Sequence, residues 1–156
     1  MHSNIKPILI TIFSLFFAIF LLISLDEGTL FLATILLAIV SIKTINSKIE
    51  KEISYDVSQI SINITIGLWF ALSIAPAIGV DMKELSILSN GFLVQTLLSF
   101  VLFIAYFKSD ISIIGTIKTR IKGGVGVVIS ALIAGAAAGI SSSALWQIYL
   151  NIAKTF

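Results

Sequence analysis

The chain has 156 residues, of which 58% are hydrophobic and only 12% are charged, against about 25% charged residues in an ordinary soluble domain. A soluble domain of this size could not bury so much apolar surface, so the composition predicts an all-α integral membrane protein with a single membrane domain over residues 1–156. The absence of cysteines and the single histidine exclude thiolate-held zinc and iron–sulfur clusters, and a net charge of +2 gives no reason to expect nucleic acid as a partner.

Five apolar segments follow one another along the chain and predict a bundle of about five transmembrane helices. In chain order they cover residues 8–25, 29–45, 60–80, 85–107 and 123–150. A spanning helix needs about 20 mainly apolar residues, which four of these segments supply. The second segment reaches that length only if the polar residues after position 42 are counted. The alternative for the first two segments is a membrane-embedded hairpin with "DEG" (26–28) as its turn.

The distribution of charge predicts how these helices are oriented. Lysine and arginine gather in cytoplasmic segments of membrane proteins. With five spans and a cytoplasmic N-terminus, eight of the ten cations fall on the cytoplasmic side, and only Lys83 and Lys154 fall outside. Five spans with the N-terminus in the cytoplasm is therefore the predicted topology.

The last apolar segment is rich in small residues. Gly135 and Gly139 form a Gly-x-x-x-Gly pattern, which allows two helix backbones to approach closely in lipid. This pattern predicts either packing within the bundle or a homo-oligomer through the Gly135/Gly139 face. Trp146 and Tyr149, near the end of the segment, are typical of side chains that anchor a helix at the membrane interface.

Polar residues are few within the apolar segments. Asn63 and Thr65 open the third segment, where they fit helix caps or hydrogen bonds between helices as well as a functional role. All eight acids fall outside the segments, and of these Asp56 is a weak candidate metal ligand. So few polar residues line the segments that a transporter or channel is not expected.

A basic, glycine-rich stretch, "IKTRIKGGVGVVIS" (117–130), precedes and enters the last segment. Its cations stand next to a predicted span, where anionic headgroups attract each of them by about 1 kcal/mol. Glycines behind cations also suit a loop that binds phosphate through its backbone. Both interpretations remain open, and the candidate phosphate-binding or headgroup-binding residues are Lys122, Gly123, Gly124 and Gly126.

Four motifs, taken in order, resemble those of the phosphatidylglycerophosphatase A family. They are "EGT" (27–29), "NITIGLWFALSIAP" (63–76), "FIAYFKSDISIIG" (103–115) and "KGGVGVVISALIAG" (122–135). Members of that family are small proteins of the bacterial inner (cytoplasmic) membrane that remove the terminal phosphate of phosphatidylglycerophosphate with Mg²⁺. The resemblance covers most of the chain and implies a multi-pass protein of that membrane and of phospholipid metabolism.

The resemblance fails at the positions that carry the chemistry. The family has an Asp-Glu pair, an Arg-x-x-Asp-x-x-Lys segment and a final Asp-Asp pair. The residues that stand at these positions here are Asn63, Ile64, Ile104, Phe107, Asp110, Ser130 and Ala131. Paired acids hold the metal, and arginine clamps phosphate with two hydrogen bonds. The resemblance therefore implies a family frame without catalytic residues, without a metal site and without a bound cofactor.

Three functional hypotheses follow from the sequence. The first is a catalytically inactive relative of the lipid phosphatase, which keeps membrane lipids and anionic headgroups as its partners. The second is a working phosphatase that binds Mg²⁺ through Asp56 and Asp110 in an atypical site. The third is an unrelated, non-enzymatic membrane protein that acts in assembly or interaction through helix packing.

Overall fold

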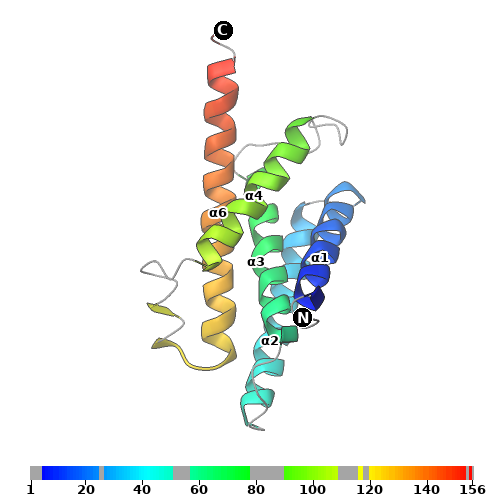
Figure 1. The fold of residues 1–156 in the computed structure, drawn as a ribbon, viewed down its shortest axis with the longest axis vertical. Coiled ribbons are helices and arrows are strands. Elements are labelled where there is room, and N and C mark those ends of the chain that lie inside the picture. Colours follow the sequence, from blue (N-terminus) through cyan, green and yellow to red (C-terminus); the bar gives the residue numbers. More distant parts are fainter. Residues whose placement is uncertain are drawn as a thin grey trace.

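The computed structural model describes residues 5–24, 27–50, 57–77, 90–108, 116–117, 120–153 and 155. Within these residues the protein is all-helical and has no strand. The five long helices are α1 (Ile5–Ser24), α2 (Glu27–Glu50), α3 (Val57–Ala77), α4 (Asn90–Lys108) and α6 (Gly124–Ala153) (Figure 1). Each lies on one of the five predicted apolar segments, so the predicted all-α architecture is confirmed.

Successive helices run in alternating directions. Gly67 of α3 faces Gly135 of α6, and Ala71, one turn later, faces Gly139, so α3 and α6 are parallel. Helix α4 crosses α6 obliquely in the opposite sense (Figure 1). The N-terminal ends of α1, α3 and α6 therefore lie toward the lower end of Figure 1, where α2 also ends, while α4 ends near mid-height beside α6.

Helix α2 differs from the sequence-based prediction. Among the described residues, Gly28–Ser47 of α2 and Gly124–Ala153 of α6 are the two helices long and apolar enough to cross a membrane. The segment expected to be marginal is thus one of the two longest. Ser41 and Thr44 do not end the helix, because each hydroxyl donates to the carbonyl four residues earlier, at 2.7 Å and 2.9 Å. Helix α2 also begins at Glu27, so the proposed turn at 26–28 is wrong for Glu27 and Gly28, which are helical.

The other three helices contain shorter apolar stretches in their described parts. These stretches are Leu9–Leu22 in α1, Ile62–Ile74 in α3 and Val94–Lys108 in α4. Membrane spanning by length and composition therefore rests on α2 and α6 within the described residues. Residues 78–80 and 85–89 of the predicted third and fourth segments lie outside the described residues.

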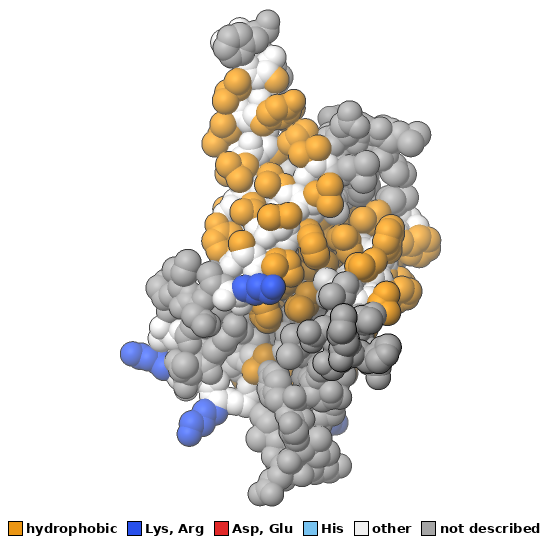
Figure 2. Space-filling model, in the orientation of Figure 1, with side chains coloured by type: hydrophobic (Ala, Val, Ile, Leu, Met, Phe, Trp, Pro, Cys, Tyr) orange, Lys and Arg blue, Asp and Glu red, His pale blue; other side chains and the backbone are white. Residues whose placement is uncertain are grey.

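Helix α3 is the centre of the packing and contacts all four other long helices. The main core joins side chains from every helix, and its buried members are Ala18, Leu22, Leu30, Leu68, Trp69, Ala71, Leu72, Phe103, Ala134 and Ala138. The outward faces of α1 and α2 are apolar as well: Phe13 is 71% exposed and Leu32 is 65% exposed. Figure 2 shows apolar side chains covering much of one face of the molecule.

Candidate functional site

The cations with described side chains lie toward one end of the bundle. Lys43 of α2 and Lys108 of α4 are exposed, as are Arg120 and Lys122 just before α6. They appear in the lower half of Figure 2, toward the end where α2 terminates and α6 begins. Helices that alternate in direction place these cations, from three separate parts of the chain, in the same half of the molecule.

A glycine turn leads from these cations into α6. Gly123 has a φ of 83°, a left-handed conformation that favours glycine. The backbone N–H of Gly124 then donates to the Asn46 side-chain oxygen at 2.8 Å. Helix α6 is therefore capped by a side chain from α2 rather than by its own preceding residue. Sequence reasoning missed Asn46, because a cap from another helix leaves no local pattern.

Two further glycines of this turn are required by close backbone contacts. A Cβ atom on Gly124 would lie 2.7 Å from the Ile42 carbonyl oxygen of α2, and one on Gly126 would collide with the carbonyl of Ile121. Packing and turn geometry thus account for the glycines without any ligand. Because the Gly124 N–H already has a partner, a bound phosphate would have to rely on other groups, above all exposed Lys122.

The segments compared with the family's catalytic positions meet where α3, α4 and α6 cross. A Cβ atom on Gly67 would collide with the ring of Phe103 and would lie 2.8 Å from the Ala131 carbonyl oxygen. The described positions that are compared with the family's catalytic residues lie within about one helical turn of this crossing. They are Asn63 and Ile64 on α3, Ile104 and Phe107 on α4, and Ser130 and Ala131 on α6.

Apolar side chains fill this crossing. Ile64, Ile104 and Phe107 all pack against the main core. The rings of Phe103 and Phe107 stack with their centroids 5.5 Å apart. Ser130 and Ala131 are fully buried. Three positions that would be charged in the family therefore contribute to a hydrophobic cluster.

The polar atoms at the crossing do not fit a magnesium ion. Ser130 Oγ already donates to the Val127 carbonyl oxygen at 2.7 Å. Asn63 is 2% exposed, and its side-chain oxygen has no hydrogen-bond partner. One free neutral oxygen does not replace the carboxylates with which proteins hold Mg²⁺. Asp56 and Asp110, the remaining candidates, lie outside the described residues.

The buried position of Asn63 also corrects an expectation about its role. A cap would stand at the helix start, whereas α3 begins at Val57 and Asn63 lies in its second turn. A buried amide oxygen without a partner costs about 1–3 kcal/mol. This atom is therefore a local destabilising feature of α3.

A polar contact between α4 and α6 was not anticipated. Gln95 Nε2 donates to Ser142 Oγ at 3.3 Å and to Ser143 Oγ at 3.5 Å, while Ser99 and Ser142 hydroxyls are 2.8 Å apart. Tyr106 and Ser141 hydroxyls are 3.0 Å apart. The expectation that few polar residues line the apolar segments was wrong here. The signal was available in the sequence, as Gln95 and Ser99 are four residues apart opposite a run of three serines.

The small residues of α6 pack against α3 in the same chain. A Cβ atom on Gly135 would collide with the backbone of Gly67, and one on Gly139 would lie 2.7 Å from the Ala71 carbonyl oxygen. Packing within the bundle thus uses the Gly-x-x-x-Gly face. A homo-oligomer through this face stays a prediction that no observation here tests.

No protein-family model, curated protein or solved structure matches the chain. The described groups offer exposed positive charge beside a capped helix start, and an apolar interior where α3, α4 and α6 cross. The first feature can attract an anion, while the second provides no described acid for metal or proton chemistry.

Proposed function

We propose that the protein is a multi-pass membrane protein with five spans and a cytoplasmic N-terminus. Three features support this proposal. The helices alternate in direction, the described cations lie toward one end, and large apolar side chains such as Phe16 (66% exposed) and Leu36 (65% exposed) face outward. In a bilayer the outward apolar surface contacts lipid, and the cationic end meets the anionic cytoplasmic leaflet.

Within that membrane, we propose a non-catalytic protein with the frame of phosphatidylglycerophosphatase A. The observation that carries this proposal is the apolar filling at the crossing of α3, α4 and α6, to which Ile64, Ile104 and Phe107 contribute. Phosphoryl transfer depends on metal ions and cations that neutralise charge on the phosphate oxygens. A site made of isoleucine and phenylalanine side chains cannot supply that stabilisation.

The partner of this protein is, on the same proposal, anionic phospholipid of a bacterial cytoplasmic membrane. The exposed side chains of Arg120 and Lys122 flank the start of α6, and each contributes about 1 kcal/mol of attraction to an anionic surface. Lys43 and Lys108 extend the positive surface toward α2 and α4. These cations are attracted by the negative charge of the lipid headgroups, and this attraction needs no precise coordination of a phosphate.

The absence of catalysis is tested with the full chain reconstituted in vesicles that contain phosphatidylglycerophosphate and Mg²⁺. We expect no phosphate release above that of protein-free vesicles. Turnover that disappears in Asp56→Ala would contradict the proposal and favour the atypical magnesium-dependent phosphatase. Phosphate release that persists in Asp56→Ala would also contradict the proposal and would assign catalysis to a different residue.

The family frame is tested by restoring the charged residues in one chain. The substitutions are Asn63→Asp, Ile64→Glu, Ile104→Arg, Phe107→Asp, Ser130→Asp and Ala131→Asp. If only the site was lost, Mg²⁺-dependent phosphate release appears in the restored chain. If the restored chain folds, as judged by its helical circular dichroism, but gains no activity, the unrelated assembly or interaction protein becomes the better hypothesis.

Headgroup attraction is tested by native mass spectrometry of the detergent-solubilised chain titrated with phosphatidylglycerol or phosphatidylcholine. We expect a preference for phosphatidylglycerol that falls by about 30-fold in Arg120→Ala/Lys122→Ala, the factor for two cations of about 1 kcal/mol each. Ser24→Ala is the matched control, because Ser24 is exposed and lies at the C-terminal end of α1, away from the cations. An unchanged preference in the double variant would refute headgroup binding at this end.

A further inference from the structure

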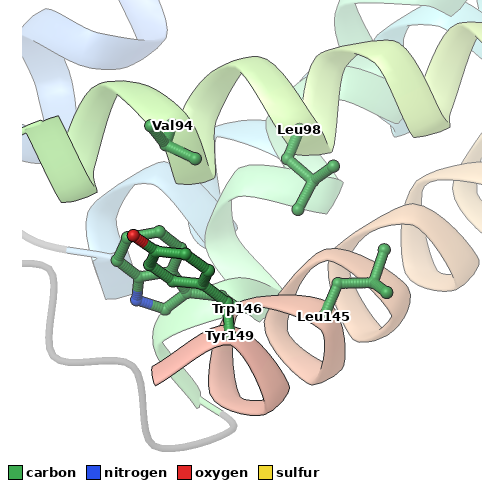
Figure 3. Close-up of a pocket in the computed structure, with 5 residues that line it drawn as sticks. All are labelled: Val94, Leu98, Leu145, Trp146 and Tyr149. Carbon is green, nitrogen blue, oxygen red and sulfur yellow. The ribbon is translucent and has the colours of Figure 1, made fainter. Parts of the chain in front are cut away.

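A groove opens between α4 and α6 at the end of the bundle away from the cations. It has a volume of about 400 Å³ and is lined by Val94, Leu98, Leu145, Trp146 and Tyr149. The rings of Trp146 and Tyr149 stack with their centroids 5.3 Å apart. Figure 3 shows the two helices as the walls of the groove.

The groove is amphipathic along its length. Figure 3 shows the indole nitrogen of Trp146 and the hydroxyl of Tyr149 at the end beneath Val94, while Leu145 lies beneath Leu98 at the other end. Because α4 and α6 are antiparallel, the second end lies deeper along both helices. Hydrogen-bond donors thus stand at the outer end of the groove, and only aliphatic side chains line its inner end.

Hydrogen bonds between α4 and α6 close the inner end. Ser99, one residue beyond Leu98, pairs with Ser142 at 2.8 Å. The helices are held together at this point and diverge toward the C-terminal end of α6. A ligand therefore enters from the outer end or from the side, and an extended chain fits better than a compact one.

The length of α6 sets the depth of the polar end. Helix α6 has 30 residues, so it is about 45 Å long, which matches a bilayer with both of its headgroup regions. When α6 is centred in the bilayer, Trp146 lies about 10 Å and Tyr149 about 6 Å from the end of the helix. This is the boundary between hydrocarbon and headgroups, where the ester carbonyls of phospholipids lie.

We propose that the α4–α6 groove binds one acyl chain of a glycerophospholipid, with Trp146 and Tyr149 donating hydrogen bonds to its ester carbonyls. The proposal rests on the membrane insertion proposed above and concerns the end of the bundle opposite to the cations. The donors match carbonyl acceptors at that depth, and the aliphatic inner end matches the chain. The site is distinct from the headgroup attraction at Arg120 and Lys122.

The test uses the quenching of Trp146 by brominated lipid. Trp69 and Trp146 are the two tryptophans of the chain, so Trp69→Phe isolates the signal of Trp146. The variant is reconstituted in phosphatidylcholine vesicles with a rising fraction of phosphatidylcholine brominated near the glycerol end of its chains. If Trp69→Phe fails to fold, the difference between the parent chain and Trp146→Phe gives the same signal.

If the groove binds a lipid, quenching of Trp146 depends on whether the brominated lipid is ester-linked or ether-linked, as well as on its fraction in the vesicle. We expect ester-linked bromolipid to reach half-maximal quenching at about a tenth of the fraction that an ether-linked analogue needs, since two hydrogen bonds together supply about this factor. Filling the groove with Leu98→Phe should abolish the difference. Leu97→Phe is the matched control, because Leu97 is 56% exposed on the same helix but does not line the groove.

The outcomes separate the two proposals. If the chain does not float with the vesicles, membrane insertion fails, and the lipid groove fails with it. If the chain floats but ester and ether lipids quench alike, Trp146 meets bulk lipid and the groove proposal alone is refuted. A floating chain with unquenched Trp146 also refutes it, because protein, such as a second copy, then covers the groove.

Discussion

Two contacts follow one another along the buried stripe of helix α6. Toward α3 it presents Gly135 and Gly139, whose missing side chains let the backbones touch. Toward α4 it presents hydroxyl groups, with Ser142 paired to both Gln95 and Ser99. The first contact depends on shape and tolerates no added atom. The second depends on polar partners, and its spacing leaves room for the groove near Trp146.

The difference shows how one helix can be fixed over one part of its length and adjustable over the next. Close packing in a membrane gains dispersion over the whole face, so a single enlarged residue disrupts many contacts. Hydrogen bonds between helices average about 0.6 kcal/mol each, so the loss of one leaves the rest. Substitutions at the contact with α3 should therefore cost more stability than substitutions at the contact with α4.

Gly135→Leu is expected to have the largest effect. The new side chain would collide with the backbone of Gly67, and the helices would have to separate along their length, at a cost of about 3 kcal/mol or more. The free energy of unfolding in mixed micelles, followed by tryptophan fluorescence, measures the loss. Ala144→Leu, at an exposed position of the same helix, should have little effect. Equal losses in both variants would contradict the close packing of Gly135 against Gly67.

Ser142→Ala should have an intermediate effect. It removes the partner of Ser99 and one of the two partners of Gln95, which keeps Ser143, and the buried Ser99 hydroxyl is left unpaired at a cost of about 1–2 kcal/mol. Ser47→Ala on exposed Ser47 is the control in the same unfolding measurement. A double-mutant cycle with Ser99→Ala should give a coupling of about 0.6 kcal/mol. A coupling of zero would mean that the two hydroxyls do not interact.

Asn46→Ala tests a third contact of α6, with α2. Loss of the hydrogen bond to the Gly124 N–H removes the cap, which should cost about 1 kcal/mol of unfolding free energy. Asn46→Asp retains an acceptor oxygen and should preserve most of the stability. Thr44→Ala is the control, because that hydroxyl bonds only within its own helix. If alanine and aspartate cost the same, the capping role is wrong.

Tyr106→Phe is expected to have the smallest effect. The ring stays in place, and only the hydroxyl facing Ser141 is removed, so the loss should be about 0.6 kcal/mol. Hydrogen exchange of the amides in α4 should rise only slightly compared with the parent chain. A loss of stability as large as that of Gly135→Leu would show that the polar contact with α4 is as sensitive to substitution as the glycine contact with α3.

The sequence was sufficient to predict the helices because apolar runs of this length have few alternatives. It was less reliable on ends: α2 extends to Glu50 because its hydroxyl groups bond to their own helix, which a hydropathy argument does not take into account. The small-residue pattern at Gly135 and Gly139 also pointed to close helix packing. It could not identify α3 as the partner, since that depends on how distant segments meet.

The sequence offered candidate positions for a site but not their surroundings. The described positions compared with the family, such as Ile64 and Ile104, lie near one crossing of three helices. What the sequence could not reveal was the steric role of Gly124 and Gly126, or the cap from Asn46. The Gly124 contact and the Asn46 cap depend on distances between α2 and α6, which leave no periodic signal in the chain.

The bond between Asn46 and Gly124 links residues that are 78 positions apart. The ribosome completes α2, α3 and α4 before it makes α6, so the acceptor for the start of α6 is synthesised first. The same holds for the backbone of Gly67, against which Gly135 packs. In a nascent chain that stops at residue 108, the surface of α3 around Gly67 therefore lacks the helix that packs against it. Docking of α6 against α3 is then the step that completes the packing of the helices.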